Sequence, residues 1–164
     1  MAQREWRTAR LLLRPWGALD LSAYAALNAD PEVMAHFPDV LSQADSDAMA
    51  RRCQSLIEAR GAGVWAVQRL DTGEFIGHVG LHTPARNLPF APCVEIAWRL
   101  ARKHWQRGFA TEALEGALVW ASKRWKRRAL VAGHFADNPA SGRVLEKAGF
   151  LYTGETRPAF SQAR

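Results

Sequence analysis

Apolar residues recur every three or four positions in the first part of the chain, which predicts amphipathic helices. Leu21, Tyr24 and Leu27 follow this spacing, and Asp20 before them is expected to cap the helix N-terminus. The pair Asp30-Pro31 is expected to start a second, short helix. A longer helix is predicted from residue 42 to residue 60, ended by the glycines that follow.

The apolar pattern changes to a period of two from Val64 onward, which predicts strands. Residues 64–70 and 75–82 flank a short turn with Gly73 and should form an antiparallel hairpin. Residues 94–100 are apolar on both faces, as in a central strand. An earlier strand is predicted at residues 10–16, with Pro15 at its end because proline has no N–H to donate.

The last third of the chain alternates helix and strand. A helix with its apolar stripe from Ala110 to Trp125 precedes a strand at 130–135, a helix from Asn138 to Gly149 and a last strand at 150–157. A strand, helix, strand order implies a right-handed crossover between two parallel strands. The expected fold is therefore a single α/β domain over residues 1–164, with a mixed, mostly antiparallel sheet and helices on both faces.

Composition restricts the partners and the compartment. The chain has 164 residues, 48% of them hydrophobic, and a formal net charge of +6, which favours an anionic partner. A basic cluster at residues 123–128 is typical of a solvated helix end and does not by itself indicate nucleic-acid binding. Cys53 and Cys93 are the only cysteines, so neither a disulfide nor a thiolate metal site is expected. With no long apolar segment, we expect a cytoplasmic protein without membrane contact.

The connection between residues 100 and 111 has the features of an anion site. A strand leads through a basic turn with Gly108 directly into a helix, where the first N–H groups have no intrahelical acceptor and the helix dipole is positive. The turn has neither a Gly-x-Gly-x-x-Gly pattern nor a P-loop. The spacing alone supports an ordinary strand-turn-helix connection as well as it supports an anion site.

Five stretches together resemble the GNAT N-acetyltransferase superfamily, in the branch of the ribosomal-protein-alanine N-acetyltransferases. They are Arg10–Trp16 with Asp30–Met34, Glu95–Leu100, Trp105–Ala113 and Asp137–Phe150, so the resemblance covers about residues 10–157. It implies an enzyme that uses acetyl-CoA as co-substrate. Trp105 stands where the superfamily has Gln or Arg, which matters little because main-chain amides hold the ligand.

The resemblance also assigns the cofactor contacts. The pyrophosphate would be held by the amides of six residues: Gln106, Arg107, Gly108, Phe109, Ala110 and Thr111. Backbone N–H groups near Ala97, Trp98 and Arg99 would bind the pantetheine arm and polarise the thioester carbonyl. The arm itself would lie where the two parallel strands splay apart.

Two residues, Ser141 and Glu95, are candidates for proton transfer. Asn138 and Ser141 suit helix capping by composition alone, but the resemblance implies that Asn138 supports the cofactor strand and that Ser141 protonates or orients the departing thiol. Glu95, a carboxylate in an apolar strand, should have a raised pKa unless it is paired, which suits a general base as well as a structural carboxylate. His78 and His82 are roughly 13 Å apart on a strand, too far to share a metal, and the reaction needs none.

The acceptor is open at this stage. By analogy with the family, the acceptor pocket should contain His36, Phe37, Trp65 and His82. The acceptor would be a primary amine, either a protein N-terminus or a small molecule. The alternative is a non-catalytic acyl-CoA-binding or basic RNA-associated module on the same fold.

The C-terminal segment departs from the family. Only residues 158–164 follow the strand predicted at 150–157, and they begin with a proline, so the superfamily's usual last strand has no good candidate. Residues 150–157 would shift inward, a partner in a homodimer would supply the strand, or the functional chain would be longer. We favour the longer chain, with the homodimer second.

Overall fold

The computed structural model describes residues 4–61, 63–82, 93–124, 129–132 and 138–151. The strands are β1 (Trp6–Arg7), β2 (Leu11–Arg14), β3 (Val64–Arg69), β4 (Phe75–His82), β5 (Cys93–Leu100) and β6 (Ala129–Val131). The helices are α1 (Asp20–Ala29), α2 (Gln43–Arg60), α3 (Phe109–Arg124) and α4 (Pro139–Lys147), with a 3₁₀ turn at Arg102–His104.

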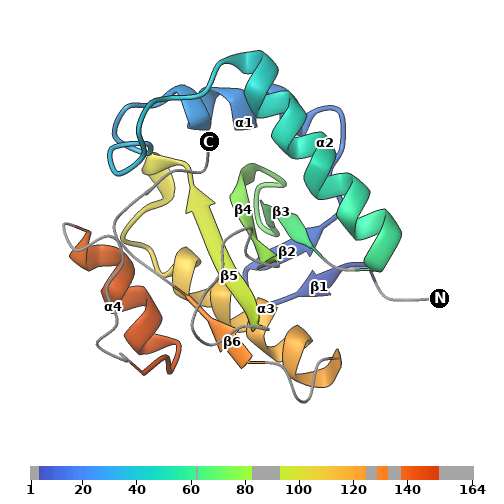
Figure 1. Cartoon of the computed structure of the whole chain (residues 1–164), viewed down its shortest axis with the longest axis vertical. Helices are drawn as coiled ribbons and strands as arrows, with labels where there is room; N and C mark the ends of the chain where they lie inside the picture. The colour runs from blue at the N-terminus through green and yellow to red at the C-terminus, as the bar shows by residue number, and fades with distance from the viewer. Residues whose placement is uncertain (1–3, 62, 83–92, 125–128, 133–137, 152–164) are drawn as a thin grey trace.

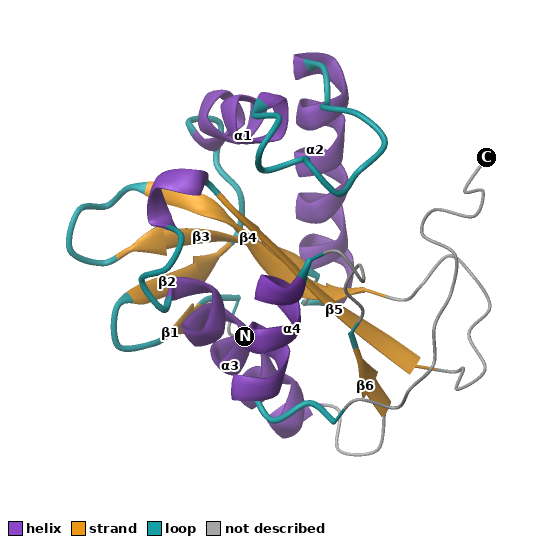
Figure 2. Cartoon of the chain, turned by 90° about the vertical axis from the view of Figure 1, so that its left-hand side faces the viewer, coloured by secondary structure: helices purple, strands orange, loops and turns teal. Residues whose placement is uncertain are grey.

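One mixed sheet organises the molecule (Figure 1). Its strands lie in the order β1-β2-β3-β4-β5-β6, and all neighbours are antiparallel except β5 and β6, which are parallel. Helices α1 and α2 cover one face, and α3 and α4 cover the other (Figure 2). The predicted mixed α/β sheet, with its parallel pair and two helical layers, is confirmed.

Each face of the sheet has its own apolar core. On the α3 face, Trp65 of β3 packs edge-to-face on Trp120 of α3, with ring centroids 5.1 Å apart. On the other face, Tyr24 of α1 packs against Trp16 and Phe75 at 4.8 and 6.1 Å. Burial of large aromatic side chains on both faces fixes the orientation of the helices that carry them.

The entry to α1 differs from the prediction. Asp20 is the first residue of the helix, and Leu19 occupies the cap position without a side-chain bond. The Asp20 carboxylate instead accepts hydrogen bonds from Arg14 at 2.7 and 2.8 Å and from the Gly17 N–H at 2.8 Å. Asp20 was therefore misplaced by one position, because Arg14 at the end of β2, six residues earlier, competes for the carboxylate.

One further element was predicted wrongly, and one was missed. The short helix expected from Asp30-Pro31 is a series of turns over residues 31–36, in which Met34 N–H bonds to Asp30 O. A helix this short does not recover its nucleation cost, and Pro38 disfavours helical geometry at Phe37. The two-residue strand β1 was not predicted, because it is too short to show a period.

Several predicted features lie outside the described residues: Trp125 of the α3 stripe, the end of the strand at 130–135, and residues 152–164 with the missing last strand. Phe150 and Leu151 are described and are not in a strand. No helix in the described ranges is both long and apolar enough to cross a membrane.

Glu112 fastens the start of α3 to the β1–β2 turn. Its Oε1 accepts from the Thr8 hydroxyl and from the Arg10 N–H, both at 2.6 Å, and its Oε2 accepts from Arg10 Nε at 2.6 Å. Burial acts to raise the pKa of this carboxyl, but the bonds from Thr8 and Arg10 outweigh it, and the net pKa is lowered. These bonds hold the helix N-terminus beside the edge of the sheet.

We expect Glu112→Gln to lower the free energy of unfolding by about 2 kcal/mol at pH 7, since charge-assisted bonds are lost. A lowered folded-state pKa contributes stability above the unfolded value near 4.5, and this stability is lost as the pH falls through the folded-state pKa. The difference from wild type should therefore shrink below pH 4.5, as measured by urea unfolding. Glu115→Gln, an exposed carboxylate on the same helix, is the control. An equal effect in both variants would contradict the assignment.

Candidate active site

The edge of β5 that faces β6 is open over much of its length. The two strands pair at Cys93–Ala129, Val94–Leu130 and Glu95–Val131, and this is where the described pairing stops. From Ile96 to Leu100 the β5 backbone has no partner strand on this side among the described residues. Unpaired strand N–H and C=O groups can bind an extended ligand as an added strand would be bound.

The turn after β5 presents further N–H groups. Gln106 and Gly108 have φ of 58° and 78°, so left-handed residues flank Arg107, which is the backbone pattern of an anion-binding nest. The first bond of α3 runs from Glu112 N–H to Gly108 O at 3.0 Å. Within the described part of the chain, the N–H groups from Gly108 to Thr111 have no hydrogen-bond acceptor.

Three arginines place positive charge around this turn. The guanidinium carbons of Arg10, Arg69 and Arg107 lie 4.3, 5.2 and 5.7 Å from the centre of the Phe109 ring. Arg10 Nη1 also donates to Arg107 O at 2.9 Å, which ties the β1–β2 turn to the α3 turn. The geometry and the charge both suit a polyphosphate at the helix N-terminus.

Helix α4 begins with Asn138 and Ser141. Asn138 is the N-cap, and its Oδ1 accepts the Ser141 N–H at 3.4 Å. Capping, which composition alone predicted, is therefore present. The Ser141 hydroxyl takes no part in that bond, and Ser141 is half-buried.

Glu95 lies opposite His82 across β4 and β5. The two residues are register partners, and Glu95 Oε2 is 3.7 Å from His82 Nε2, with 14% and 35% of the side chains exposed. The carboxylate is thus paired with an imidazole and is not isolated within the apolar strand. A paired carboxylate and imidazole at the end of the open β5 edge can accept a proton from an amine.

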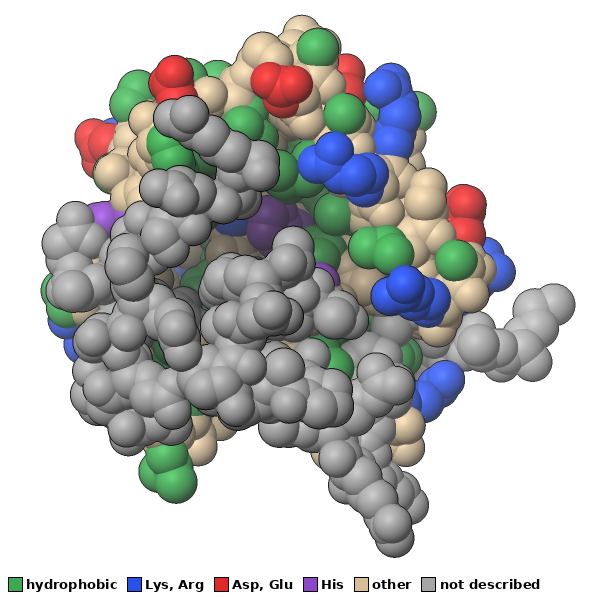
Figure 3. Space-filling model, viewed as in Figure 1, with side chains coloured by type: hydrophobic (Ala, Val, Ile, Leu, Met, Phe, Trp, Pro, Cys, Tyr) green, Lys and Arg blue, Asp and Glu red, His purple; other side chains and the backbone are tan. Residues whose placement is uncertain are grey.

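The acceptor candidates do not all lie together. Strand register places His78 opposite Arg99 and His82 opposite Glu95, so these four side chains share the α1 face of the sheet. Phe37 joins them, because the Arg99 guanidinium carbon is 4.5 Å from its ring centre. The half-buried His36 precedes Phe37 in the turn after α1. Figure 3 shows a hollow near the centre of the molecule with histidine atoms in its depth.

Trp65 does not belong to this group. Its side chain is 2% exposed and packs on Trp120, on the opposite face of the sheet. It is a core residue, and its placement in the acceptor pocket is corrected.

A buried polar cluster on the α1 face was missed. Tyr24 Oη lies 2.9 Å from His78 Nδ1, and Asn28 accepts from Arg99 Nη1 at 2.7 Å and donates to Ser46 Oγ at 3.0 Å. Burial first, then Arg99 and His82, lowers the pKa of His78, so its imidazole is neutral at pH 7. The sequence held one signal for this cluster: Asn28 is a polar residue on the apolar stripe of α1, four residues after Tyr24 and so on the same helix face.

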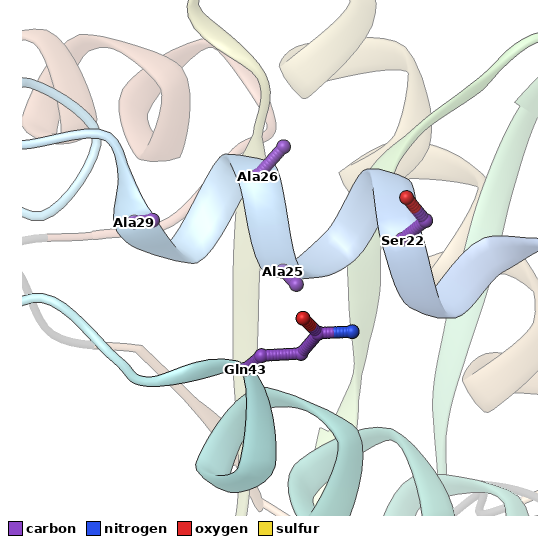
Figure 4. Close-up of a pocket in the computed structure, with 5 residues that line it drawn as sticks. All are labelled: Ser22, Ala25, Ala26, Ala29 and Gln43. Carbon is purple, nitrogen blue, oxygen red and sulfur yellow. The ribbon is translucent and has the colours of Figure 1, made fainter.

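Two surface grooves lie outside this site. One, of about 290 Å³, runs between α1 and the start of α2 and is lined by Ser22, Gln43 and three alanines (Figure 4). The other, of about 380 Å³, lies beside Phe75 and Ala101 and has a charged rim. The described residues include no group of three or more His, Cys, Asp or Glu that could hold a metal ion.

Comparison with known proteins gives one consistent result. Residues 10–151 match the acetyltransferase (GNAT) domain. An uncharacterised N-acetyltransferase of Bacillus subtilis, YoaA, is 30% identical over 92% of this chain and 84% of its own length.

Solved structures agree in fold. A GNAT-family acetyltransferase from Bacillus anthracis superposes with a TM-score of 0.79 at 24% identity, covering 94% of this chain and 90% of its own. The spermidine N-acetyltransferase of Vibrio cholerae, in complex with CoA and spermine, has a TM-score of 0.70 at 20% identity, covering 90% of this chain and 84% of its own.

Proposed function

Because this chain belongs to the GNAT family of acetyltransferases, we propose that it transfers an acetyl group from acetyl-CoA directly to a primary amine. Membership makes it an acetyl-CoA-dependent acyltransferase. One observation carries the proposal. The β5 edge from Ile96 to Leu100 is unpaired in the described structure and leads to the start of α3, where the N–H groups from Gly108 to Thr111 have no acceptor among the described residues.

The residues present fit CoA. The N–H groups from Gln106 to Thr111 would bind the pyrophosphate, with Arg10 and Arg107 adding positive charge. The open backbone of Ala97, Trp98 and Arg99 would hold the pantetheine arm as an added strand. The spermidine N-acetyltransferase that shares this fold has CoA in its structure, which supports the same assignment here.

The chemistry requires three changes: a C–N bond forms, a C–S bond breaks and a proton is transferred. The neutral amine nitrogen attacks the carbonyl carbon, the C–N bond forms, the C–S bond breaks, and the proton lost by the amine is matched by one gained by the thiolate. A backbone N–H near Ala97 would polarise the carbonyl oxygen. Glu95, paired with His82, would take the amine proton directly or through water, and the Ser141 hydroxyl would donate to the sulfur.

The test is thiol release from acetyl-CoA in the presence of a panel of primary amines. We expect amine-dependent release with at least one acceptor. Binding of CoA without release in the presence of any amine, peptide N-termini included, would overturn catalysis and favour an acyl-CoA-binding module.

The RNA-associated alternative has less support from the structure. The described part of the basic cluster packs against the protein itself, with Lys123 Nζ 4.8 Å from the Trp6 ring and the Arg124 guanidinium 5.4 Å from the Trp120 ring.

A further inference from the structure

Arg99 is a cation without a counter-ion in the described structure. Its Nη1 donates to Asn28, its guanidinium lies over Phe37, and its Nε is buried with no hydrogen-bond partner. No carboxylate of the described residues forms an ion pair with it. An arginine stays protonated at neutral pH even where burial lowers its pKa, as it does here. A partly buried charge without a counter-ion is unfavourable, and binding of an anion would relieve it.

The titratable groups that face Arg99 are neutral at pH 7. Burial raises the pKa of Tyr24 to about 12 and that of Cys53 to about 11. Burial also lowers the pKa of His78, opposite Arg99 on β4, so this imidazole adds no charge of its own. The C-terminus of α1, where Asn28 lies, gives partial compensation, because a helix end supplies roughly half a charge.

The neighbours hold the guanidinium in one orientation. A guanidinium can only donate, so the Asn28 atom that faces it must be Oδ1, and the Asn28 amide then donates to Ser46. Asn28 and Ser46 are both 0% exposed, which fixes this arrangement. Arg99 itself keeps part of its surface exposed, and its Nη2 has no bond to a described residue. A rigid fork with a free N–H edge matches a carboxylate.

We propose that Arg99, held by Asn28 and Phe37, is an anion subsite of the acceptor pocket, and that the acceptor is a primary amine that also carries a carboxylate. This inference rests on the proposed acetyl transfer. Arg99 shares its face of the sheet with Glu95 and His82, so one molecule can place its amine toward that pair and its carboxylate on Arg99. One cation matches a carboxylate better than a phosphate, which carries nearly two charges. A polyamine would be repelled.

The first experiment compares matched acceptors. Thiol release is measured with glycine, β-alanine and 4-aminobutyrate and with the carboxamide of each. In at least one pair we expect kcat/KM for the acid to exceed that for the amide by about tenfold or more, the range of a charge-assisted hydrogen bond. Equal acetylation of acids and amides would overturn the subsite and leave acetyl transfer standing.

The second experiment neutralises Arg99 in place. Asn28→Asp keeps the shape and can still accept from the Ser46 hydroxyl, but it gives Arg99 a permanent counter-ion. We expect KM for the preferred acid to rise about tenfold, kcat and the KM for the amide to change little, and thermal stability to be kept. Arg99→Gln should give the same loss of preference, and Arg102→Gln, an exposed arginine beyond β5, should not. If Asn28→Asp leaves the preference for acids intact, Arg99 has only a structural role.

A binding measurement separates the two proposals. Titration of the same amino acids into the CoA-loaded protein reports the subsite without turnover. If the wild-type protein binds the acids and Asn28→Asp does not, the subsite is supported, even if no thiol is released. The absence of thiol release would count only against acetyl transfer. No binding of any of the acids to the wild-type protein would overturn the subsite.

Discussion

Replacing Gly108 by aspartate is expected to weaken CoA binding by at least about 100-fold, or about 2.7 kcal/mol. Gly108 has φ of 78° and is exposed in the turn that opens α3. A side chain there would stand between the N–H groups and the pyrophosphate, and a carboxylate would also repel it. Isothermal titration with CoA measures the effect.

Gly73→Asp is the matched control for this variant. Gly73 has nearly the same φ, 72°, and a β-carbon there would meet no atom within 4 Å, so both substitutions carry the same backbone strain. Both variants should therefore lose thermal stability through this strain, and Gly108→Asp must in addition displace Arg10 Nη2, which would lie 3.2 Å from its β-carbon. Only Gly108→Asp should lose CoA binding. Unchanged affinity in Gly108→Asp would remove the turn from the cofactor site.

The elements that carry the cofactor assignment were predictable because their signals are local. The apolar run of β5, the basic turn with Gly108 and the apolar stripe of α3 lie within about thirty consecutive residues. Period and turn chemistry specify such a unit without reference to the rest of the chain. The left-handed conformation of Gln106 was not predictable, because nothing in the residue type requires it.

The acceptor side depended on contacts between distant segments. In β3 three consecutive residues, Trp65, Ala66 and Val67, are buried, so a period of two could not tell which face Trp65 occupies. Asn28 and Arg99 are 71 residues apart in sequence and meet only in the folded chain. Asn28, a polar residue on the buried face of α1, indicated that a polar partner exists but not which residue it is.

The charge on Arg99 also bears on the choice among acceptors. Spermidine is the acceptor in the name of one structure that shares this fold, but a polycation would have to approach an uncompensated guanidinium. Like charges at close range in a partly buried site oppose binding. The fold therefore allows several acceptor classes, and on the proposed assignment the side chains on the α1 face would discriminate between them.

Replacing Ser141 by alanine is expected to lower kcat by about 10- to 100-fold, with little change in KM for acetyl-CoA. The reason is that the thiolate leaves with its charge developing in the transition state, where a hydroxyl donor is most effective. The substitution is clean, because the bond that caps α4 comes from the backbone N–H of Ser141 to Asn138 and survives in alanine. Thermal stability should therefore be unchanged.

Two variants locate the effect. Ser122→Ala removes an exposed hydroxyl that donates to Val119 O within α3, and it should leave kcat as in wild type. Asn138→Ala removes the cap itself and should cost about 1 kcal/mol of stability, which Ser141→Ala should not. If the leaving thiol needs a proton from Ser141, the defect of Ser141→Ala should also shrink with a thioester whose thiol has a lower pKa, since that thiol departs with less assistance. Full activity in Ser141→Ala would show that the residue serves only the cap.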